Sequence, residues 1–98
     1  ATADPAKRSA NGNTVLHVAA ASGNGEALQQ LLQNTSFIDM QNARGATALI
    51  VASARGRANA VSQLLQAKAS KSVRDRSGFT AEEWAAAAGA KDIAELLR

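Results

Sequence analysis

The sequence predicts an all-α protein in which one helix-turn-helix unit is stacked several times. The first observation is a repeat of 33 residues: residues 12–23 read GNTVLHVAAASG, residues 45–56 read GATALIVASARG, and residues 78–89 read GFTAEEWAAAAG. The second is that apolar residues follow each copy at helical spacing. Copies at a fixed offset are typical of repeat proteins, in which each unit buries its face against its neighbours.

Each copy begins with a turn and a helix start. A glycine stands two residues before a threonine, and glycine tolerates the positive φ that a tight turn needs. The threonine hydroxyl is then placed to cap the following helix. The turn glycines are Gly12, Gly45 and Gly78, and the capping threonines are Thr14, Thr47 and Thr80. Glu83 follows Thr80 at three residues, which predicts a reciprocal capping box.

A second glycine closes each first helix, where a left-handed C-cap favours this residue. These glycines are Gly23, Gly56 and Gly89, so the first helices are predicted over residues 14–22, 47–55 and 80–88. A second helix is predicted in each unit, over residues 25–33, 58–67 and 91–98. Helix-favouring Ala, Gln, Glu and Leu dominate these segments, and their leucines recur at helical spacing.

The unit resembles the ankyrin repeat. Residues 14–20, TVLHVAA, are similar to the family's T-P-L-H-x-A signature, and residues 47–53 keep this framework with Ile50 in place of the usual histidine. Residues 75–97 resemble a terminal ankyrin repeat, with Glu82 where an interior repeat carries a buried leucine. The departures are Val15, Ala48 and Ala81, which stand where proline is common in the family.

This resemblance implies an ankyrin-repeat solenoid of stacked helix-turn-helix units joined by hairpin-like loops, as a single domain over residues 1–98. Its parts are the tail of a preceding repeat (1–8), two repeats (9–41 and 42–74) and a terminal capping repeat (75–98). The resemblance also implies a non-enzymatic protein–protein interaction module whose hairpin tips and first helices line a concave groove. In this signature the side chain of His17 ties adjacent turns together by hydrogen bonds.

The composition indicates which other functions to set aside. The chain has no cysteine, which excludes disulfides and thiolate metal sites, and His17 is its only histidine. We therefore expect no catalytic residue, metal, cofactor or small-molecule substrate. The longest apolar stretches are far shorter than the ~20 residues that a membrane span needs. We expect an intracellular protein, cytoplasmic or nuclear.

Positive charge is concentrated in the middle of the chain. Between residues 43 and 76 seven basic residues stand against Asp75 alone, a net charge of +6. In an ankyrin geometry Arg44, Arg74 and Arg76 fall on turn segments, and Arg55 ends a first helix. We predict that these four arginines bind the partner, an acidic protein or peptide, because guanidinium groups bind carboxylates in a bidentate manner. The alternative is that they are solvated charges that keep an alanine-rich solenoid soluble.

Two aromatic residues complete the set of candidates. Phe79 directly follows a turn glycine and is predicted to face the groove, either as an interface anchor or packed against its own hairpin. Trp84 stands at the helical position of Val18 and Val51 and is predicted to pack in the core.

Two further functions remain as alternatives. In the first, the repeats serve as an intramolecular scaffold or spacer in a larger protein. In the second, they bind nucleic acid or anionic lipid through the basic middle repeat. We rank nucleic acid last, because readers of single strands combine basic residues with stacking aromatics, and only Phe79 is available.

Overall fold

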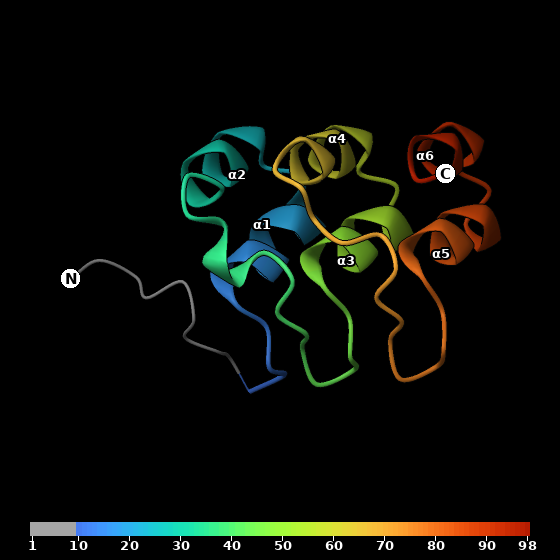
Figure 1. The fold of residues 1–98 in the computed structure, drawn as a ribbon, viewed down its shortest axis with the longest axis horizontal. Coiled ribbons are helices and arrows are strands. Elements are labelled where there is room, and N and C mark those ends of the chain that lie inside the picture. The colour runs from blue at the N-terminus through green and yellow to red at the C-terminus, as the bar shows by residue number, and fades with distance from the viewer. Residues whose placement is uncertain (1–9) are drawn as a thin grey trace.

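The computed structural model describes residues 10–98 and consists of two rows of helices (Figure 1). One row contains α1 (Val15–Ser22), α3 (Ala48–Ala54) and α5 (Ala81–Ala87). The other row contains α2 (Gly25–Leu31), α4 (Ala58–Gln66) and α6 (Lys91–Leu96). A short 3-10 helix, η1 (Thr35–Phe37), follows α2, and residues 10–98 contain no strand. The predicted all-α fold is confirmed; the predicted tail at residues 1–8 lies outside the described residues.

Each helix contacts its partner within the unit and its equivalent in the next unit. Within a unit α1 contacts α2, α3 contacts α4, and α5 contacts α6. Between units the contacts follow the rows, from α1 to α3 to α5 and from α2 to α4 to α6. The loops that precede the first helix of each unit project to one side of the two rows (Figure 1). We call the loops at residues 10–13, 42–46 and 75–79 the first, second and third hairpins.

The predicted helix starts are found at all three sites. The threonines occupy N-cap positions, and each hydroxyl accepts the backbone N–H three residues later. The three pairs are Thr14 with His17, Thr47 with Ile50, and Thr80 with Glu83. Glu83 also accepts the N–H of Thr80 at 3.0 Å, so the predicted capping box is confirmed. In the first unit His17 takes this place, because its Nδ1 accepts the N–H of Thr14 at 3.1 Å.

The turn glycines and the closing glycines adopt the left-handed backbone conformation that was predicted for them. The turn glycines Gly12, Gly45 and Gly78 have φ of +76°, +78° and +84°, and the closing glycines Gly23, Gly56 and Gly89 have φ of +71°, +72° and +76°. Helix α1 ends at Ser22 as predicted, and the other five helices end one or two residues earlier than predicted. After α2, for example, Gln33 and Asn34 donate to carbonyls three residues back instead of four. Helix ends commonly tighten into such turns, which moves the boundary by one or two residues.

The core lies between the two rows and is filled by leucine, isoleucine, valine and alanine. Leu28, Leu49 and Leu64 have no exposed surface. Several alanines are equally buried, and they leave room for the helices of adjacent units to approach closely. Glu82 stands at the position of Leu49 and is only half-buried, because no helix of residues 10–98 packs on the far side of α5 and α6.

Candidate functional site

Main-chain hydrogen bonds join each hairpin to the next. The N–H of Ala43 donates to the carbonyl of Asn11 at 3.1 Å, and the N–H of Arg76 donates to the carbonyl of Arg44 at 2.9 Å. The approach is close enough that a Cβ added to Gly45 would lie 2.9 Å from the nitrogen of Arg76. Glycine is therefore required at this position both for its positive φ and for its small size.

A side chain at the start of the second and third hairpins holds the turn in shape. Oδ1 of Asn42 accepts two backbone N–H groups of its own hairpin, and Oδ1 of Asp75 does the same in the next unit. The donors to Asp75 are Ser77 at 2.9 Å and Phe79 at 3.0 Å. Asn and Asp favour such turns because their short side chains reach the backbone two to four residues later.

His17 ties the first unit to the second. Its ring is 1% exposed, and Nε2 donates to the carbonyl of Ala46 in the second hairpin at 2.8 Å. Because Nδ1 accepts the N–H of Thr14, the proton lies on Nε2. These hydrogen bonds are of the kind that the resemblance implied for His17. In the second unit this place is taken by Ile50, which is buried and packs in the core.

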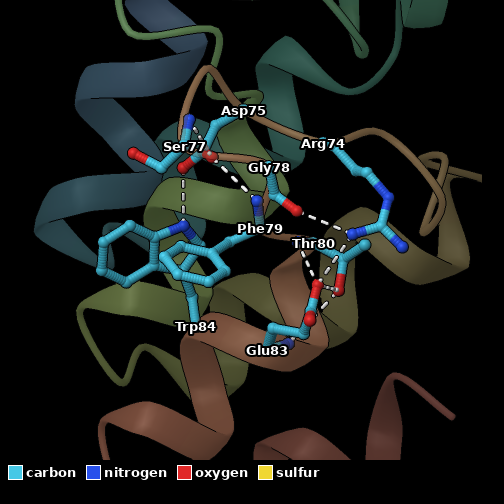
Figure 2. Close-up of polar contacts among 8 residues, drawn as sticks. All are labelled: Arg74, Asp75, Ser77, Gly78, Phe79, Thr80, Glu83 and Trp84. Carbon is cyan, nitrogen blue, oxygen red and sulfur yellow. Dashed lines mark hydrogen bonds and ion pairs between the residues drawn. The ribbon is translucent and has the colours of Figure 1, made fainter.

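The two aromatic rings of the third unit lie together beside its hairpin (Figure 2). Their centroids are 5.5 Å apart in an edge-to-face arrangement, and Nε1 of Trp84 donates to Oδ2 of Asp75 at 2.7 Å. Trp84 is half-buried and packs against the core, and it also presents surface to solvent. Phe79 is 45% exposed, so it is both packed against Trp84 and available to a partner.

Hydrogen bonding keeps Asp75 ionised. Partial burial opposes the charged form, but the N–H groups of Phe79, Ser77 and Gly78 and the indole of Trp84 together outweigh it. The pKa of Asp75 is consequently below its ordinary value. A negative charge therefore remains beside the Trp84 ring at neutral pH.

Arg74 lies apart from the other predicted arginines. Its Nη1 donates to the carbonyl of Gly78 at 2.7 Å and to Oε1 of Glu83 at 3.2 Å. Figure 2 shows this contact on the opposite side of the hairpin from the two rings. The pKa of Glu83 is lowered, first by the N–H of Thr80 and then by the Thr80 hydroxyl and Arg74. Arg74 thus holds the third hairpin against the start of α5.

The remaining three arginines line a continuous depression that we call the groove. It consists of three hollows that share residues. The central hollow, about 200 Å³, lies between α3 and α5 and is bordered by Arg44, Arg55, Asp75 and Trp84. Arg44 and Arg55 also line a second hollow, about 230 Å³, beside the first hairpin. Arg44 also borders the third, about 440 Å³, together with Arg76 and Trp84.

The groove is positively charged. No ion pair within residues 10–98 neutralises Arg44, Arg55 or Arg76. Asp75 is the acidic residue among those that line the three hollows. The structure thus brings together three of the four predicted arginines and places Phe79 at the edge of the third hairpin.

The apolar part of the groove was missed by the sequence analysis. Val18, at the helical position equivalent to Trp84, is 59% exposed, and Val51 is half-buried. The reason is that this helical position faces the groove, so Val51 and Trp84 line the central hollow. Asp75 was also missed as a partner of Trp84. The nine-residue separation of Asp75 and Trp84 spans a turn and a helix start and follows no helical period.

The fold and groove define a repeat protein of stacked helix pairs. A family model described as ankyrin repeats (3 copies) matches residues 16–98. The chain therefore belongs to the ankyrin-repeat family, whose members are generally protein–protein interaction modules and typically non-catalytic. A search of curated proteins gives no match.

Among residues 10–98, no helix has the length and apolar character to cross a membrane. The same residues contain no cluster of three or more His, Cys, Asp or Glu side chains that would hold a metal ion.

Proposed function

We propose that this domain binds an acidic segment of a partner protein in the groove, through Arg44, Arg55 and Arg76. The observation that carries the proposal is that these three side chains border contiguous hollows and form no ion pair within residues 10–98. Guanidinium groups form strong, often bidentate hydrogen bonds with carboxylates. A concave basic surface also raises the association rate of an acidic partner.

Phe79 and Arg74 have different parts in this proposal. Phe79 contributes exposed aromatic surface at the end of the third hairpin, beside Trp84. Arg74 was included in the predicted set, but its guanidinium is engaged by Gly78 and Glu83. We assign it to maintaining the hairpin that carries Arg76 and Phe79.

The test is a pull-down with the wild-type domain and the double variant Arg44→Glu/Arg55→Glu, with bound proteins identified by mass spectrometry. The matched control is Lys68→Glu/Lys91→Glu, which makes the same change in net charge at exposed residues outside the groove. We expect the control to retain the specific partner and the groove variant to lose it, with at least about a tenfold drop in affinity. Equal recovery by both double variants would overturn the proposal.

A further inference from the structure

The central hollow is not a purely polar site. Ala46, Ile50, Val51 and Ala54 form its wall, and the ring of Trp84 closes one end. The two arginines that border this hollow come from different elements: Arg44 from the second hairpin and Arg55 from the C-cap of α3. A ligand that carried only carboxylates would leave the apolar wall in contact with water, which gives up the binding free energy available from apolar burial.

The charge of Asp75 orients whatever enters. Its carboxylate lies at the Trp84 end of the hollow, where it would repel a second carboxylate or a phosphate. An uncharged group is therefore favoured beside Trp84, and carboxylates are favoured toward Arg44 and Arg55. In an extended peptide, side chains two residues apart point to the same side, so acidic residues two positions before and after an apolar residue can face Arg44 and Arg55 while the apolar side chain enters the hollow.

Resting on the function proposed above, we infer that the partner's segment contains a leucine-sized apolar residue flanked by acidic residues. The apolar side chain occupies the central hollow against Val51, Ala54 and Trp84. The flanking carboxylates bind Arg44 and Arg55. The ligand is thus an acidic peptide with an apolar anchor, and neither a uniformly acidic chain nor a nucleic acid has this combination.

Trp84 provides the readout. It is the only tryptophan of the chain, which has no tyrosine, so the intrinsic fluorescence at long wavelength comes from the wall of the hollow itself. The probes are three capped pentapeptides of equal length. The first has four glutamates around a central leucine, the second has serine in place of the leucine, and the third keeps the leucine and has glutamines in place of the glutamates.

We expect the leucine–glutamate peptide to change Trp84 emission in a saturable manner and to bind about tenfold or more tightly than the serine peptide. The glutamine peptide is expected to bind more weakly than the leucine–glutamate peptide, with a loss that shrinks as salt is raised. Equal affinity of the leucine and serine peptides would overturn the apolar anchor and leave the acidic-segment proposal standing. Equal affinity of the glutamate and glutamine peptides, or no saturable change at millimolar peptide, would overturn both.

A pocket-filling variant tests the same point from the side of the protein. Ala54→Leu places a larger side chain in the central hollow without changing any charge. The control is Ala87→Leu at the equivalent position of α5, which is exposed and does not line the hollow. We expect Ala54→Leu to reduce affinity for the leucine–glutamate peptide to that of the serine peptide, while Ala87→Leu leaves it unchanged.

Binding of the serine peptide to Ala54→Leu at wild-type affinity shows that the variant is folded, which circular dichroism confirms independently. Full retention of leucine-peptide affinity by a folded Ala54→Leu variant would overturn the inference. A thymidine decanucleotide tests the alternative that the groove binds nucleic acid. Tighter binding of this oligonucleotide than of the leucine–glutamate peptide, with a steep dependence on salt, would also overturn it.

Discussion

Nε1 of Trp84 and Oδ2 of Asp75 lie 2.7 Å apart, and this hydrogen bond joins helix α5 to the hairpin that precedes it. The other oxygen of the same carboxylate accepts the N–H groups of Ser77 and Phe79. One side chain therefore fixes both the turn and the orientation of the indole ring. Because Trp84 forms one end of the central hollow, Asp75 determines the shape of the groove at that end.

The first prediction concerns the stability of the fold at acidic pH. The pKa values of Asp75 and Glu83 are both lowered in the folded protein by hydrogen bonds to their carboxylates. Their contribution to stability is complete above the unfolded-state values of about 4 and is lost as pH falls through the lowered values. The melting temperature is expected to decline below about pH 4, as measured by circular dichroism from pH 7 to pH 2.

The variant Asp75→Asn isolates one of these two groups. Asn42 shows that an asparagine maintains the turn through Oδ1, so the hairpin is retained, whereas the negatively charged acceptor for the Trp84 indole is removed. We expect a stability loss of about 1 kcal/mol at pH 7 and a shallower decline of the melting temperature in acid. A variant with the wild-type pH profile would contradict this assignment.

The second prediction concerns the tie between the first and second units. His17→Ala removes the donor to the carbonyl of Ala46 and leaves a cavity at a fully buried position. The free energy of unfolding is expected to fall by about 2–4 kcal/mol, measured by urea titration. Ile50→Val at the equivalent position of the second unit removes one methyl group and is expected to cost about 1 kcal/mol. Similar losses for the two variants would show that the hydrogen bond is not the main contribution.

The third prediction separates two requirements for glycine. Gly45 and Gly78 both have positive φ, but an added Cβ meets a neighbouring hairpin only at Gly45, 2.9 Å from the nitrogen of Arg76. Gly78→Ala is therefore expected to cost about 1–2 kcal/mol from backbone strain alone. Gly45→Ala is expected to cost more, because the contact between Arg76 and Arg44 must open. Equal destabilisation in urea titrations would contradict the close approach.

Most of the fold was predictable because the repeat supplies the same local signals several times. A threonine cap, a left-handed glycine and a leucine-rich helix are local features, and the resemblance of residues 14–20 to the ankyrin signature gave the arrangement of the units. The role expected of His17 came from the same resemblance. Glu82 also indicated a terminal unit, since it stands where an interior unit buries a leucine.

The groove was less predictable, because the set of residues that line it depends on the direction in which each side chain projects from its turn. Arg74 and Arg76 are two residues apart, yet Arg74 contacts Glu83 while Arg76 lines the groove. Backbone dihedral angles within the hairpin decide this, and no sequence period encodes them. Trp84 was assigned to the core by its position in the helix, although the side chains at this helical position, Val51 and Trp84, also line the central hollow.

The link between hairpins, from the N–H of Arg76 to the carbonyl of Arg44, uses only main-chain atoms. The side chains of Arg44 and Arg76 take no part in this bond, so substitution at these two positions does not alter the distance from one unit to the next. Selection, or a protein engineer, can exchange the ligand chemistry of this surface by substitution alone. A basic groove, an acidic one or a hydrophobic one would all be displayed at the same pitch.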